Sequence, residues 1–185
     1  PLEHRLAGGL PGPMFAEFHA AGRLPHGTVG EVAFQDLWAE VNRFAHRLEP
    51  LMPSGAERTL EGCWELGGTS FTARLAGIRG SGCLRHRFGR LRARDVIDVW
   101  VQHLLLCLAA EGAAGCESIM VCTDQTLRLA PVAESRAALE GLLRLYRRGI
   151  EMPLAFFPES SLAYARGARR SEARAMAAAR SAWEG

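Results

Sequence analysis

Seven arginines and one histidine lie between residues 74 and 94, within a stretch from Gly67 to Arg94 that contains no Asp or Glu. Guanidinium groups carry a permanent charge and donate hydrogen bonds in a planar fork that fits phosphate oxygens. A cluster of such donors without internal acids could neutralise DNA phosphates, although a solvated strand face is the commoner reason for such a pattern. The candidate DNA contacts are Arg74, Arg79, Arg85, Arg87, Arg90 and Arg92.

Two strands and a helix must position these side chains. Residues 69–79 and 82–89 alternate apolar and polar side chains, as half-buried antiparallel strands do, with a glycine-rich turn between them. Alternation places Arg85 and Arg87 on one face, and the turn could set Arg74 opposite them. Residues 94–111 are apolar nearly all round, which predicts a helix packed between the sheet and another element.

The rest of the chain completes an α/β pattern. A helix begins at Thr28, which with Glu31 has the spacing of a capping box, and it ends before Pro50. Further segments are expected as strands over 59–66, 118–123 and 126–130, and as a helix from 131 or 134 to 148 that Gly149 closes. Residues 159–185 are rich in Ala and Arg and are expected to form a terminal helix.

Composition sets limits on function. The 185 residues carry a formal net charge of only +2, so nucleic-acid binding would require local clustering of charge. The five cysteines show no zinc-ligand spacing, which favours reduced core thiols and a cytoplasmic location. No apolar run is long enough to cross a bilayer, so no membrane association is expected. We expect one domain over 1–185, with its core over 28–149, as a fragment of a longer subunit.

The order α-β-β-β-α-β resembles the core of restriction-endonuclease-like, PD-(D/E)XK nucleases, a mixed sheet flanked by helices. That resemblance implies metal-binding acids at the end of the second strand and in an acid-x-Lys triplet on the third. Laid on this sequence, the first position falls near Ala76 and the triplet on Arg85-His86-Arg87. Cationic side chains cannot coordinate a divalent cation. We therefore expect no catalytic residue, no metal and no cofactor here.

Four segments point to a narrower family: residues 15–31 (FAEFHAAGRLPHGTVGE), 75–87, 99–107 (VWVQHLLLC) and 145–160 (LYRRGIEMPLAFFPES). They resemble, in the same order, the C-terminal part of the RecC family, the gamma subunits of bacterial exodeoxyribonuclease V. The resemblance implies an inactive nuclease-like domain, not an enzyme by itself, that works in a complex. The implied partners are RecB-like and RecD-like helicase subunits and forked or single-stranded DNA. The implied role is strand guidance in DNA repair and recombination.

Two other interpretations stay open. The domain could be an active metal nuclease whose carboxylates have migrated to other positions, namely Glu61, Glu65, Asp95 or Asp98. Alternatively, it could be a pure interaction module whose arginines dock acidic faces of partner subunits.

Two polar residues lie in the most apolar part of the helix over 94–111. These residues, Gln102 and His103, are expected to form core hydrogen bonds.

Overall fold

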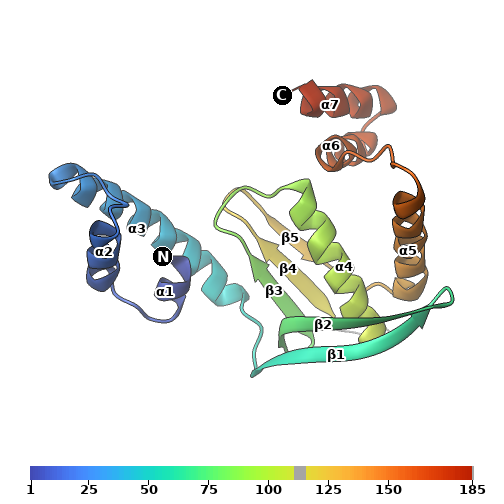
Figure 1. The fold of residues 1–185 in the computed structure, drawn as a ribbon, viewed down its shortest axis with the longest axis horizontal. Helices are drawn as coiled ribbons and strands as arrows, with labels where there is room; N and C mark the ends of the chain where they lie inside the picture. The colour runs from blue at the N-terminus through green and yellow to red at the C-terminus, as the bar shows by residue number, and fades with distance from the viewer. Residues whose placement is uncertain (111–115, 185) are drawn as a thin grey trace.

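One mixed sheet organises the computed structural model, which describes residues 1–110 and 116–184. Its strands are β1 (Glu57–Leu66), β2 (Thr69–Arg79), β3 (Gly82–His86), β4 (Glu117–Val121) and β5 (Thr126–Leu129). They lie in the order β1-β2-β3-β4-β5, with β3 and β4 parallel and each other neighbouring pair antiparallel (Figure 1). The mixed sheet with flanking helices confirms the predicted α/β class.

Helices precede, interrupt and follow the sheet. They are α1 (Leu2–Leu6), α2 (Pro11–Ala20), α3 (Thr28–Leu48), α4 (Ala93–Ala109), α5 (Ser135–Glu151), α6 (Pro158–Ala168) and α7 (Glu172–Glu184). A short 3-10 helix over Glu49–Leu51 follows α3. The chain from α3 to β4 thus has the expected α-β-β-β-α-β order, with α4 as the crossover between the two parallel strands.

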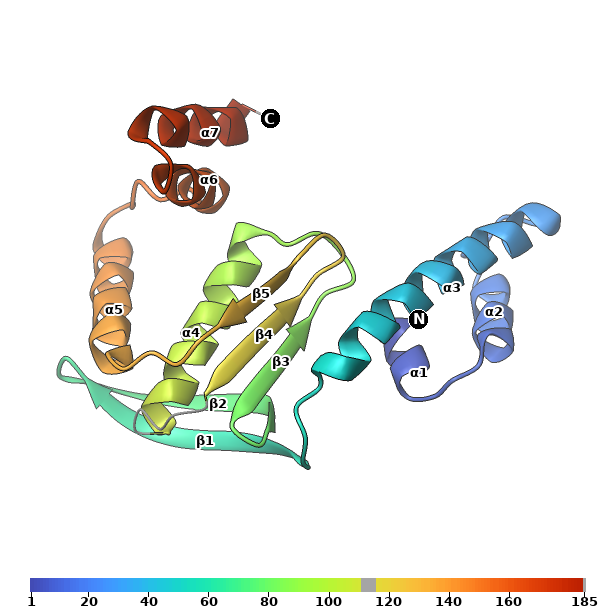
Figure 2. The same ribbon diagram turned by 180° about the vertical axis from the view of Figure 1, so that it is seen from behind.

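The C-terminal part of α3 and helix α4 pack on opposite faces of the central strands. Val41, Phe44 and Leu48 of α3 pack with Ile119 and Val121 of β4 in one buried cluster. Helix α4 lies across the other face, as Figures 1 and 2 show from opposite sides. There its apolar residues pack with β2 and with α5, so the prediction that this helix has a partner on each side is confirmed.

Strand β2 contains one extra residue relative to β1. Arg58 pairs with Ile78, whereas Leu60 pairs with Leu75, so two steps along β1 span three along β2. This spacing is a β-bulge, and Gly77 within it has φ +75°, a left-handed conformation that favours glycine. The bulge bends β2 next to the point where it pairs with β3.

Several predicted boundaries at the start and middle of the chain were wrong. Thr28 is the first residue of α3 and not its cap; Gly27, with φ 70°, holds the cap position without a side-chain bond. Strand β3 ends at His86, so Arg87 lies beyond it. Residue 111, the expected end of the helix after β3, lies outside the described residues.

The C-terminal elements also differ from the expectation. Helix α5 continues through Gly149 to Glu151, because the first break in the helical pattern comes before Pro153. The single terminal helix expected over 159–185 is two helices, α6 and α7, with a turn after Ala168. Residue 185 itself is not described.

Replacing Leu104 by Ala should test the core between β2 and α4. The Leu104 side chain is fully buried among the larger apolar cluster, so Leu104→Ala should lower the free energy of unfolding by about 2–5 kcal/mol. Leu145→Ala is the matched control on α5, because Leu145 is 52% exposed and should change stability by only about 0.5 kcal/mol. Denaturant titration measures both; equal effects would contradict this packing.

Candidate nucleic-acid interface

The Arg85 guanidinium connects three elements of the fold. Its Nε donates to Oε1 of Gln102 on α4 at 2.9 Å, and its Nη2 donates to the carbonyl oxygen of Ala76 at 2.9 Å. Gly77 lies beside this group, and a Cβ there would stand 3.4 Å from Nη1, an ordinary van der Waals contact. Arg85 therefore fixes β3 to the bulge of β2 and to α4.

Three positions singled out from the sequence thus meet at one point. Ala76 and Arg85 were matched to the nuclease acids, and Gln102 was expected to form a core hydrogen bond, which is confirmed. The space between the carbonyl of Ala76 and the amide of Gln102 holds a side-chain cation. A divalent metal does not fit among these residues. The guanidinium fills the space between the two oxygens, and it offers only hydrogen-bond donors where a metal requires acceptor oxygens.

Burial raises the pKa of the neighbouring Cys83 thiol, and the positive charge of Arg85 partly opposes that rise. Cys83 is therefore protonated at neutral pH, as a core residue and not a nucleophile.

Arg87 is held by an acid from the next helix. Its Nη1 donates to both carboxylate oxygens of Asp95, at 3.0 and 2.8 Å. Oδ2 of Asp95 also accepts the backbone N–H of Arg92 at the start of α4. The Asp95 side chain keeps only 15% of its surface in solvent and the Arg87 side chain 31%, so this largely shielded pair closes the loop between β3 and α4.

The arginines of β2 face acids across the β1–β2 hairpin. Arg74 Nε lies 3.0 Å from Glu61 Oε1, and Arg79 Nη2 lies 3.3 Å from Glu57 Oε2. Strands β2 and β3 pair only at Ile78–Cys83 and Arg79–Gly82, so Arg74 does not lie opposite Arg85 or Arg87 as the sequence suggested. These exposed pairs stabilise the fold little.

The loop between β3 and α4 presents the least engaged arginines of the group. Arg90 and Arg92 are both exposed. Arg90 stands 4.0 Å from Asp124 Oδ2, at the limit of an ion pair. Asp124 has its pKa lowered chiefly by the hydrogen bond from the Leu91 backbone N–H. We call Arg90 and Arg92 the loop arginines.

His86 and His103 both form contacts within the fold. Nε2 of His86 lies 3.1 Å from Glu3 on α1, on the other side of the sheet from Arg85. His103 is fully buried, and its two nitrogens contact Ser118 Oγ at 3.0 Å and the Ala130 carbonyl at 2.8 Å. Because a carbonyl only accepts, Nε2 carries the proton. The prediction of a satisfied core histidine is confirmed.

The acids of the migrated-carboxylate interpretation are dispersed. Glu61 pairs with Arg74, and Asp95 serves Arg87 and the start of α4. Over residues 1–110 and 116–184, no three His, Cys, Asp or Glu side chains come close enough together to hold a metal ion. No helix in those ranges is long and apolar enough to span a membrane.

One contact was missed from the sequence. Glu159 at the start of α6 accepts the backbone N–H of Ala93 at 2.9 Å, which joins α6 to the first turn of α4. Proline followed by an acid at residues 158–159 is the usual signal for a helix start, but it does not indicate which helix the carboxylate caps.

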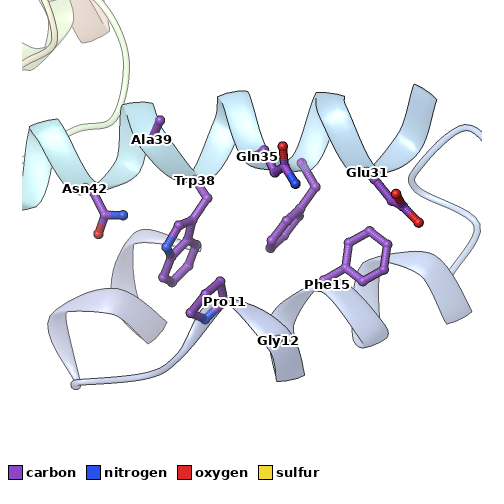
Figure 3. A pocket seen from close by; sticks show the side chains of 9 residues that line it. Pro11, Gly12, Phe15, Glu31, Gln35, Trp38, Ala39 and Asn42 are labelled. Atoms are coloured by element: carbon purple, nitrogen blue, oxygen red, sulfur yellow. The ribbon is translucent and has the colours of Figure 1, made fainter. Parts of the chain in front are cut away.

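A separate apolar groove lies between α2 and α3, away from the arginines (Figure 3). Its aromatic wall includes Phe15 and Phe34, whose ring centroids are 5.3 Å apart. Its volume is about 530 Å³, and it is lined by Pro11, Gly12, Phe15, Glu31, Phe34, Gln35, Trp38, Ala39 and Asn42. It contains no arginine and contributes nothing to a phosphate-binding surface.

Comparisons with known proteins point to the same family as the four sequence segments described above. A model of the RecC C-terminal domain family matches residues 2–169. The curated RecBCD enzyme subunit RecC of Escherichia coli (strain K12) is 29% identical over 153 residues. The aligned region covers 82% of this chain but only 13% of that protein.

Replacing Arg85 by Met should lower stability, because it removes a charged donor from Gln102 and Ala76 while keeping an unbranched side chain. We expect a loss of about 1.5–3 kcal/mol in the free energy of unfolding. The control is Arg74→Met, which breaks an exposed ion pair and should cost less than about 1 kcal/mol. Urea titration with circular dichroism measures both, and equal losses would contradict the structural role of Arg85.

Proposed function

The chain belongs to the RecC C-terminal domain family, and on that premise we propose that it is a non-catalytic, nuclease-like domain of an exodeoxyribonuclease V gamma-type subunit. It contributes subunit contacts and DNA-strand guidance during double-strand break repair and recombination. The E. coli relative is named as a subunit of the RecBCD enzyme, so the proposed partners are RecB-like and RecD-like helicase subunits in the cytoplasm. The proposed core of the PD-(D/E)XK-like fold is 28–149.

The observation that carries this proposal is the Arg85 contact with Ala76 and Gln102. A nuclease of the resembled class needs acceptor oxygens converging on a cation at this place. Here the acceptors converge on a guanidinium of the chain itself. In this proposal the nuclease-like fold is kept, and the hydrogen bonds from Arg85 to Ala76 and Gln102 take the place of a metal site.

DNA contact is proposed chiefly for the loop arginines. All six candidates can attract phosphates, but Arg85 and Arg87 are engaged within the fold. Arg74 and Arg79 each face a glutamate, which offsets their charge. Arg90 and Arg92 have the fewest such restraints and are exposed on one loop. Their contact with DNA would be electrostatic and independent of base sequence.

A titration with divalent metal separates this proposal from an active nuclease. Isothermal titration with Mg²⁺ or Mn²⁺ should show no saturable event, and the thermal midpoint should not rise, because a ligand that binds only the folded chain would raise it. Saturable micromolar binding would contradict the proposal. Loss of that binding in Asp95→Asn would then assign it to migrated carboxylates.

The salt dependence of DNA binding tests the loop arginines. Each neutralised phosphate contributes a slope of about −0.7 to −0.9 in log affinity against log salt, so Arg90→Ala with Arg92→Ala should flatten the slope by roughly 1–2 units. The measurement uses the full-length subunit assembled with its RecB-like and RecD-like partners on forked DNA.

The matched control is Arg74→Ala with Arg79→Ala, which removes the same charge from the hairpin. A flattened slope in this control alone would move the DNA contact to β2. An unchanged slope in both variants, with assembly impaired, would favour the pure interaction module.

A further inference from the structure

Residues 152–157, Met-Pro-Leu-Ala-Phe-Phe, connect α5 to α6 as an apolar run without a charged or hydrogen-bonding side chain. All six residues are exposed; Met152, Phe156 and Phe157 each keep about half of their surface in solvent. A contiguous apolar patch on a folded surface generally marks an interaction site. We call residues 152–157 the connecting segment.

Prolines hold the connecting segment out of a helix. A proline disfavours helical geometry in the residue before it, and Pro153 and Pro158 follow Met152 and Phe157. Met152 has φ −150° and ψ 150°, and Phe157 has φ −117° and ψ 103°. Both ends of the segment are therefore extended, and their conformation is fixed by the sequence before any partner binds.

The backbone of the segment is unpaired. The N–H of Met152 bonds to Arg148 and the carbonyl of Phe157 to Ser161, which are the last and first bonds of the flanking helices. Between them, no described residue bonds to the backbone of residues 153–156. An extended run with free donors and acceptors can pair with the backbone of another polypeptide.

Both ends of the segment are anchored. Leu139 fixes α5 in the larger core cluster, and Glu159 joins α6 to Ala93 of α4. The Phe157 ring packs edge-on against Trp183 of α7, with centroids 4.5 Å apart. The segment is thus presented between two secured helices, which lowers the ordering cost of binding.

More exposed apolar surface lies on either side. Ile150 at the end of α5 is 69% exposed, and Trp183 is 64% exposed. With the connecting segment they form what we call the apolar strap: Ile150, Met152, Leu154, Phe156, Phe157 and Trp183.

The part of the chain that carries the strap, from α5 to α7, has a net positive charge, although Glu151 and Glu159 adjoin the connecting segment. Residues 135–184 contain nine arginines and five glutamates, a net charge of +4, whereas the whole chain is +2. Arg144, Arg147 and Arg148 lie on α5 just before the strap. An acidic border on a partner would complement this charge.

We propose that the apolar strap docks into an apolar groove with an acidic border on a helicase-type subunit, a claim that rests on the function proposed above. The unpaired backbone calls for a polypeptide, because lipids and bases offer no strand edge. The aliphatic side chains of Ile150, Met152 and Leu154 also fit a protein groove better than stacked bases. The free backbone and the apolar side chains are satisfied together by this occupant.

Substitution of the strap tests the proposal in the full-length subunit. Leu154→Asp with Phe156→Asp should weaken binding to one purified RecB-like or RecD-like subunit by about tenfold or more, since buried apolar anchors dominate interface affinity. The thermal midpoint of the unbound subunit should stay unchanged. The control, Val29→Asp with Val32→Asp on α3, alters two apolar residues with exposures of 65% and 55% and should leave binding unchanged.

Other results would overturn the proposal. Unchanged binding, or equal losses in both double variants, would show that the strap is not the docking surface. A lowered thermal midpoint in the unbound full-length variant would mean that its own polypeptide covers the strap. If the substitutions dissociate a homodimer, the strap binds a second copy of the chain. If they weaken DNA binding while assembly stays intact, the strap binds DNA, and if they abolish vesicle binding, it binds lipid. If the unsubstituted subunit binds neither helicase subunit, the function proposed above fails instead.

Discussion

A single guanidinium links β2, β3 and α4 within the apolar core that they share. Arg85 donates to the Ala76 carbonyl on the bulge of β2 and to Gln102 on α4. Strands β2 and β3 pair at only two positions. The hydrogen bond from Arg85 to Ala76 adds one more connection between these two strands. The surrounding core is apolar, and the link gives it one specific arrangement.

The same principle extends over the arginine-rich stretch. Acids from outside the acid-free segment face its arginines in the folded chain: Glu57 and Glu61 from β1, Asp95 from α4 and Asp124 from the turn before β5. The net positive surface is consequently much smaller than the count of arginines suggests. What remains for a phosphate is concentrated on the loop before α4.

Local patterns predicted the fold well and the site less well. Strand β2 was placed at its observed ends, and the apolar helix and the order of elements followed from periodicity, since these depend on near neighbours. The link from Arg85 to Ala76 depends on a bulge, and the pairing of Arg87 with Asp95 depends on where β3 ends. Neither is encoded in a short window, because alternation indicates a face but not the partner across it. Proximity of Glu159 to α4, 66 residues away, could not be anticipated from residue types at all.

The Arg85 link also has a kinetic consequence. The three elements that it joins, β2, β3 and α4, are consecutive in the chain, and the bonded residues lie only 9 and 17 positions apart. Closing such short loops costs little conformational entropy, so the link can form before the distant pairing of β3 with β4. A contact that is already formed in the transition state affects the rate of folding and hardly changes the rate of unfolding. The guanidinium would therefore help to determine how fast the fold forms, and not how long it persists.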